Sequence, residues 1–135
     1  MLKLFYGAGA CSLASHITLE EIGQAYETYS VNMAKGEHKS PEYLKINPRG
    51  KVPALQIDDQ FLIENVAIQN YLVKHFPEAG LAPKDPLGES RWLSVNAWRF
   101  GADSAPLLLR GFAASSSEVS LPLSPAIGTI RSALS

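Results

Sequence analysis

The N-terminal segment constrains the fold most strongly, because it alternates between strand and helix patterns. The apolar run Leu2–Tyr6 predicts a buried strand, and a turn rich in glycine and alanine follows it. Ser12 is a candidate helix N-cap, and Leu13 and Ile17 follow at the spacing of one helix face. A second strand is predicted over Tyr26–Val31. Strand, helix and strand within about thirty residues form a βαβ unit, so we expect the two strands to be parallel.

The middle of the chain predicts a helix, a hairpin and a further helix. Serine, proline and an acidic residue in succession indicate a short helix over Pro41–Ile46. The segments Lys51–Ile57 and Phe61–Glu64 flank an acidic turn, which predicts two antiparallel strands. Asn65 can cap a helix that ends before Pro77. The expected element order is therefore βαβ, then α, then ββα.

Composition shifts divide the chain into three parts. Residues 1–80 carry the strand and helix patterns. Residues 81–86 form a linker, which follows Gly80 and contains Pro83 and Pro86. Asp85 and Pro86 start another helix, which contains Trp92 and Trp98. Residues 87–135 are expected to be a partial helical domain with an irregular tail, because no helical period is visible after Leu109.

The overall composition excludes several classes of protein. Of 135 residues, 46% are apolar and 19% are charged, which suits a packed core. The net charge of −1 gives no electrostatic case for nucleic acid or an acidic membrane surface. No apolar run approaches the ~20 residues of a membrane span. A single cysteine cannot form an internal disulfide, which fits the cytoplasm, and three scattered histidines show no metal-ligand spacing with it.

Cys11 is the first candidate for chemistry. It lies just before a predicted helix start, where free N–H groups and the helix dipole favour an anion such as a thiolate. The neighbouring Ser12 could donate a hydrogen bond to a nearby sulfur. A free cysteine is also among the most buried residue types and often only packs. From position alone, the packing interpretation is favoured.

Two dipeptides and one lysine are further candidates. Proline at Val52-Pro53 could form a cis bond that turns backbone groups toward an extended peptide, although only about 5–6% of such bonds are cis, so trans is favoured. Glu64-Asn65 could hold a ligand's ammonium and carboxylate, but a helix cap beside an exposed acid is the simpler interpretation. Lys35 in the polar loop is most simply a solvated charge.

Taken together, three stretches resemble the glutathione transferases, and specifically their bacterial beta class. They are KLFYGAGACSLASHITLEE, NPRGKVPAL and LIENVAIQNYL, and the resemblance covers Met1 to Trp98. It implies a thioredoxin-like α/β N-terminal domain of order βαβ-α-ββα, followed by an all-α C-terminal region that is incomplete here.

The resemblance also implies roles for individual residues. Val52 would offer its backbone to the cysteinyl part of glutathione, with Pro53 cis. Glu64 and Asn65 would hold the γ-glutamyl end, and Lys35 would reach the glycyl carboxylate. The implied catalytic residues are Cys11, which lies against the glutathione sulfur and can form a mixed disulfide with it, and the nearby Ser12 and Tyr6.

The implied activity is conjugation of the glutathione thiolate to electrophilic small molecules, or reduction of glutathione mixed disulfides. Such a detoxification enzyme would be a cytoplasmic homodimer that uses glutathione as co-substrate and no metal, nucleic acid or membrane. The histidine expected on the first helix of the second domain falls at Gly101, which departs from the beta-class pattern. The alternative is therefore a non-catalytic glutathione-binding remnant of a truncated or frame-shifted transferase. A stand-alone glutaredoxin-like reductase is less favoured, because the chain continues into a tryptophan-bearing helix.

Overall fold

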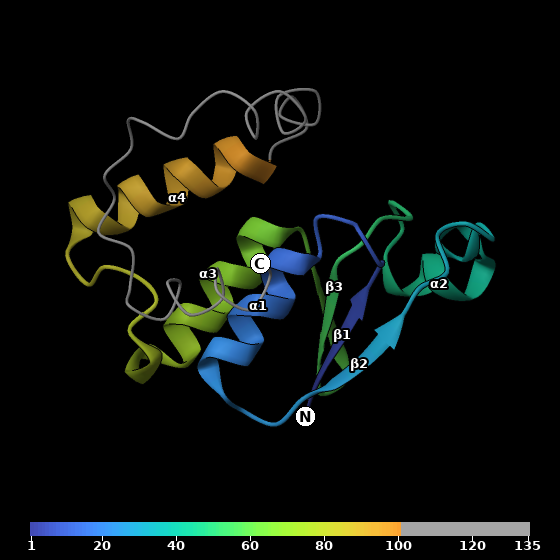
Figure 1. The fold of residues 1–135 in the computed structure, drawn as a ribbon, viewed down its shortest axis with the longest axis horizontal. Helices are drawn as coiled ribbons and strands as arrows, with labels where there is room; N and C mark the ends of the chain where they lie inside the picture. Colours follow the sequence, from blue (N-terminus) through green and yellow to red (C-terminus); the bar gives the residue numbers. More distant parts are fainter. Residues whose placement is uncertain (101–135) are drawn as a thin grey trace, which may run out of the picture. The chain divides into compact units, whose positions relative to one another are not determined.

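The structure is a computed structural model that describes residues 1–100 of the chain (Figure 1). The strands and α-helices of residues 1–100 follow one another in the expected order, and two 3-10 helices that were not predicted lie among them. In chain order the elements are β1 (Leu2–Tyr6), α1 (Leu13–Ile22), β2 (Glu27–Ser30), the 3-10 helix η1 (Glu37–Lys39), α2 (Pro41–Ile46), β3 (Ala54–Ile57), β4 (Gln60–Ile63), α3 (Asn65–His75), the 3-10 helix η2 (Pro77–Ala79) and α4 (Pro86–Phe100).

The four strands form one mixed sheet in the order β2-β1-β3-β4. β1 pairs with β2 in parallel, which confirms the βαβ prediction. β3 pairs antiparallel with both β1 and β4, which confirms the hairpin. The helices α1 and α3 lie together on one face of the sheet, and α2 lies on the other (Figure 1). This is the thioredoxin-like arrangement that the resemblance implies.

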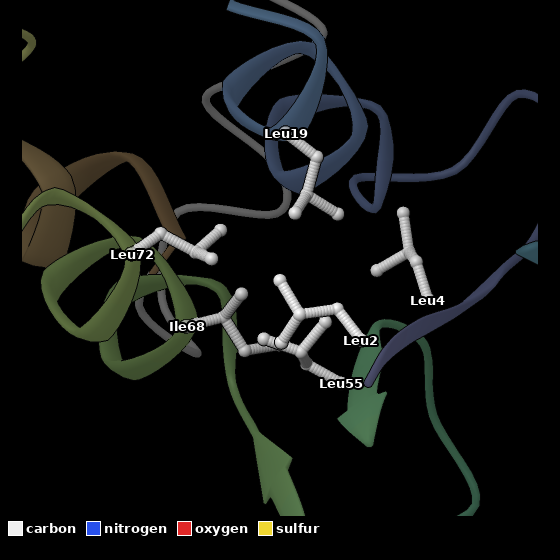
Figure 2. Close-up of a cluster of buried hydrophobic side chains, with 6 residues drawn as sticks. All are labelled: Leu2, Leu4, Leu19, Leu55, Ile68 and Leu72. Atoms are coloured by element: carbon white, nitrogen blue, oxygen red, sulfur yellow. The ribbon is translucent and has the colours of Figure 1, made fainter. Parts of the chain in front are cut away.

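Alternation along β1 divides the core between the two faces of the sheet. One cluster lies between the sheet and the helices α1 and α3, and its buried side chains come from both (Figure 2): Leu2, Leu4, Leu19, Leu55, Ile68 and Leu72. Phe5 points to the opposite face, because successive strand residues alternate. There it packs in a second cluster with Val31, Tyr43, Val52 and Ala54. The second cluster includes Val52, so packing fixes one candidate site residue directly.

The helical spacing of Leu13 and Ile17 does not mark the buried face of α1. Leu13 is 61% exposed and Ile17 is 36% exposed, whereas Ser15 and Leu19 are fully buried. Positions two residues apart lie about 200° apart around a helix, so the two pairs occupy nearly opposite sides. The side of α1 that packs against the sheet and α3 is therefore the side that carries Ser15 and Leu19.

Several local boundaries differ from the predicted ones, and β2 is also shorter, at Glu27–Ser30 rather than Tyr26–Val31. Glu64, not Asn65, is the N-cap of α3, and Asn65 is the first helical residue. β3 begins at Ala54 rather than at residue 51, directly after Pro53, which has no N–H for a sheet ladder. β4 begins one residue early, at Gln60, because the turn is shorter than predicted.

The helix predicted from Asp85-Pro86 is present as α4. Its start is stabilised by the Asp85 carboxylate, which accepts a hydrogen bond from the Gly88 N–H at 2.7 Å. The predicted tail beyond residue 100, including Gly101, lies outside the described residues. Within residues 1–100, no helix combines the length and apolar character that crossing a membrane requires.

Candidate functional site

Cys11 lies in the turn between β1 and α1, and its side chain is exposed. The expectation that it only packs is therefore wrong. Its sulfur lies 3.5 Å from the carbonyl oxygen of Val52 and donates a hydrogen bond to it. The turn thus presents a thiol directly beside the backbone of the segment that precedes β3.

Val52 and Pro53 are joined by a cis peptide bond. The trans form favoured by residue frequencies is wrong, and the cis form implied by the resemblance is confirmed. The preceding residue is also held in place, because the carbonyl oxygen of Lys51 accepts hydrogen bonds from the Tyr43 hydroxyl at 2.8 Å and from the Asn47 side-chain amide at 2.7 Å. Burial raises the pKa of Tyr43 from 10.0 to about 12, so this donor keeps its proton further into the alkaline range.

Ser12 follows Cys11 in the turn between β1 and α1, and it is fully buried. Its hydroxyl accepts a hydrogen bond from the Gly7 N–H at 3.1 Å and donates one to the Gly7 carbonyl at 3.2 Å. A serine has a single donor, and here that donor is used on Gly7, so it is not free to donate to a sulfur. The geometry indicates that Ser12 holds the turn, and its catalytic role stays a prediction.

Tyr6 is the last residue of β1, and its ring lies on the face of the sheet that α1 covers. The ring packs against the first core cluster and lies 5.3 Å from the ring of His16. The structure therefore places this ring against α1, and its catalytic role also stays a prediction.

Glu64 connects β4 to α3 in an unusual backbone conformation. Its φ is 74° and its ψ is 128°, a region that residues with a side chain rarely adopt. Such conformations concentrate at functional sites. The carboxylate is about half exposed and forms an ion pair with Arg49, at 2.7 Å between Oε1 and Nη1. Glu64 thus presents a negative charge at the start of α3.

The side chain of Asn65 points inward, and only 4% of the residue is exposed. Its amide nitrogen donates to the carbonyl oxygen of Cys11 at 3.0 Å. The structure therefore brings Asn65, Cys11 and Val52 together at one end of the sheet, with Glu64 next to Asn65.

Within residues 1–100, no hydrogen bond or ion pair joins Lys35 to this group. Its backbone N–H bonds to the Asn32 side chain at 3.0 Å, and its ammonium forms no ion pair in this part of the chain. Two nearby residues that sequence reasoning left as ordinary polar residues, His38 and Lys39, lie beside the turn that precedes Val52. The Lys39 ammonium is 3.4 Å from the carbonyl oxygen of Arg49. The buried Nδ1 of His38 has no hydrogen-bond partner in the described part of the chain.

No sequence signal marks His38 and Lys39, because their proximity to the Val52 segment depends on tertiary packing. Gly50 has a φ of 58°, and a Cβ there would lie 2.7 Å from the His38 carbonyl oxygen. Only glycine allows η1 to approach the turn this closely.

A hollow of about 350 Å³ lies elsewhere, between the end of α3, residues 77–84 and α4. Val73, Trp92 and Leu93 are among the residues that line it. None of the candidate site residues lines it, so this hollow is separate from the candidate site.

Comparison with known proteins identifies the family. Residues 1–74 match the family model described as glutathione S-transferase, N-terminal domain. The chain belongs to the glutathione S-transferase family. It is 41% identical over 112 residues to glutathione S-transferase GstA of Escherichia coli O157:H7, a match that covers 78% of this chain and 56% of that protein. It is 39% identical over 110 residues to a maleylacetoacetate isomerase of Pseudomonas aeruginosa, covering 78% of this chain and 51% of that protein.

Solved structures of glutathione transferases share the fold. A Sulfitobacter glutathione transferase homolog with bound glutathione matches with a TM-score of 0.73 at 32% identity, covering 87% of this chain and 58% of that one. A bacterial beta-class glutathione S-transferase from Sphingomonas chungbukensis matches with a TM-score of 0.69 at 39% identity, covering 86% of this chain and 59% of that one. The chain spans about half the length of the curated relatives it matches.

Proposed function

We propose that this chain is a beta-class glutathione transferase that binds glutathione beside Cys11 and the Val52-Pro53 segment. The observation that carries the proposal is the exposed Cys11 sulfur, 3.5 Å from the Val52 carbonyl oxygen, in a member of this family. The glutathione bound to the Sulfitobacter homolog and the beta-class Sphingomonas neighbour support it.

The proposed binding mode uses the backbone first. An extended tripeptide can pair with the backbone of Val52 as an added strand, which brings its cysteinyl sulfur next to Cys11. Glu64 then accepts the γ-glutamyl ammonium at the start of α3. Lys35 provides positive charge for the glycyl carboxylate, and Lys39 supplements it.

Two reactions fit this arrangement. In the first, the thiolate of glutathione attacks an electrophilic carbon, a thioether forms, and the leaving group departs with its electron pair. In the second, the thiolate of Cys11 attacks the glutathionyl sulfur of a glutathione mixed disulfide, Cys11 becomes glutathionylated, and the other thiol leaves as a thiolate. A glutathione thiolate then attacks the glutathionyl sulfur on Cys11, releases the Cys11 thiolate and forms glutathione disulfide. In the proposed site, Tyr6 and Ser12 support the turn between β1 and α1 that carries Cys11.

The proposed cellular context follows the family. We propose a cytoplasmic homodimer that acts in detoxification and uses glutathione as co-substrate, with no metal. The domain division at residues 1–80, 81–86 and 87–135 belongs to the same proposal. The alternative of a non-catalytic remnant rests on residues beyond 100, and the transferase relatives favour the enzyme.

The test separates binding from turnover. The chain is passed over immobilised glutathione and then assayed with glutathione and a chlorinated aromatic acceptor. Retention together with conjugate formation above the uncatalysed rate is expected. Retention without turnover would select the remnant, and loss of both would overturn the proposal.

A further inference from the structure

The side chain of Asn65 joins the start of α3 to the turn that carries Cys11. Its Nδ2 donates to the Cys11 carbonyl oxygen at 3.0 Å, and the hydroxyl of Ser15 donates to its Oδ1 at 2.7 Å. Ser15 is fully buried and Asn65 is 4% exposed. We call this chain of hydrogen bonds, Ser15 to Asn65 to Cys11, the Asn65 link.

The partners determine which way the amide of Asn65 faces. A carbonyl oxygen can only accept, so the nitrogen must face Cys11 and the oxygen must face Ser15. The same Cys11 carbonyl accepts the N–H of Ala14 at 3.3 Å, within the first turn of α1. Both lone pairs of this carbonyl are therefore occupied by groups that are themselves held in place.

The Asn65 link acts on the residue that carries the thiol. On one side of Cys11 the hydroxyl of Ser12 bonds to Gly7, and on the other the Asn65 link ties Cys11 to α3. With its backbone held from both sides, the Cys11 side chain has only a few staggered rotamers with which to reach Val52. The position of its sulfur therefore depends on these ties.

We propose that Asn65 is a positioning residue for Cys11 rather than the γ-glutamyl contact that the resemblance implies. This inference rests on the proposed function, because its measurable consequence is the rate at which Cys11 reacts with glutathione disulfide. A misplaced reacting atom lowers such a rate even where the ligand still binds. Asn65 therefore governs reactivity and not affinity.

The test uses Asn65→Ala and Ser15→Ala, with Ser90→Ala as the control. Ser90 lies on α4 and bonds to the Pro86 carbonyl of its own helix. Affinity is measured with S-methylglutathione, which has no thiol to react. Reactivity is measured as the rate of mixed-disulfide formation at saturating glutathione disulfide.

We expect Asn65→Ala and Ser15→Ala each to lower the rate about fivefold, the factor that one net hydrogen bond represents. Affinity for S-methylglutathione should stay at the wild-type value, and Ser90→Ala should change neither quantity. Ser15 is buried and cannot touch a ligand, so its effect must pass through Asn65. Weaker affinity in Asn65→Ala with a wild-type rate in Ser15→Ala would overturn the inference, and so would wild-type rates in both variants.

A second measurement needs no ligand and separates the two proposals. If the wild-type chain does not bind S-methylglutathione, the proposed function fails, and amide hydrogen exchange still tests the Asn65 link. Both variants should exchange faster in residues 10–16 while α2 stays unchanged. Equal changes across the whole chain, or none in residues 10–16, would overturn the inference.

Discussion

The sulfur of Cys11 lies 3.5 Å from the carbonyl oxygen of Val52, although 41 positions separate them in the chain. One residue belongs to the turn after β1 and the other to the loop before β3, and these strands are hydrogen-bonded neighbours. The sheet therefore places a thiol and the backbone of the Val52-Pro53 segment at the same end. This juxtaposition is the geometric basis of the proposed glutathione site.

Cys11→Ala should abolish the covalent reaction with oxidised glutathione. Cys11 is the chain's single cysteine, so the protein mass reports on this thiol alone. Wild type should gain the mass of one glutathionyl group, and the variant should gain nothing. The native chain should also react faster than its urea-unfolded form, because the site gathers the reactants. Equal rates in the two forms would contradict a preformed site.

Glu64→Gln should weaken binding of S-methylglutathione about tenfold, because it removes the charge of a proposed ammonium acceptor. The Glu64–Arg49 pair is exposed on both sides, so the free energy of unfolding should change by less than about 1 kcal/mol. Calorimetric titration and urea unfolding measure the two quantities. Glu89→Gln is the matched control, since Glu89 pairs with Lys74 away from the site. A similar loss of affinity in both variants would count against a role for Glu64.

Leu19→Ala should lower the free energy of unfolding by about 2–5 kcal/mol, because Leu19 is fully buried in the first core cluster. Leu13→Ala on the same helix should change it by less than about 0.5 kcal/mol, because Leu13 is 61% exposed. Urea unfolding followed by circular dichroism measures both. Equal losses would mean that α1 buries a different stripe.

Tyr43→Phe should remove part of the alkaline loss of stability. The pKa of Tyr43 is raised from 10.0 to about 12 in the folded chain. A raised pKa contributes stability that is full below the unfolded value, so it is lost as pH rises from about 10 to about 12. Unfolding free energies measured across this range should fall less steeply in the variant than in wild type.

Tyr26 also has a pKa of about 12 and titrates in the same window. It is present in both proteins, so the difference between their curves isolates Tyr43. At neutral pH the variant should lose about 1 kcal/mol with its hydrogen bond to Lys51. Parallel curves at high pH would refute the assignment.

The sequence by itself determined the order and type of the strands and α-helices in residues 1–100, although not the two 3-10 helices. These elements follow from local signals: the strand and helix periods, the Ser40 cap and the positions of proline and glycine. Local hydrogen bonding and backbone sterics are enough to explain each of these signals. The family resemblance added the cis form at Pro53, which residue frequencies alone opposed.

Only the tertiary structure decided which side chains meet. On α1, packing buries Ser15 and Leu19 and leaves Leu13 and Ile17 exposed. At the start of α3, the side chain of Asn65 bonds to the Cys11 carbonyl instead of capping the helix. The same packing brought His38 and Lys39 to the turn before Val52. These contacts join residues far apart in the chain, and their energies depend on how helices lie on the sheet. Local sequence patterns do not specify how the helices lie on the sheet. Sequence reasoning therefore identified Cys11 but not the hydrogen bonds that hold its backbone.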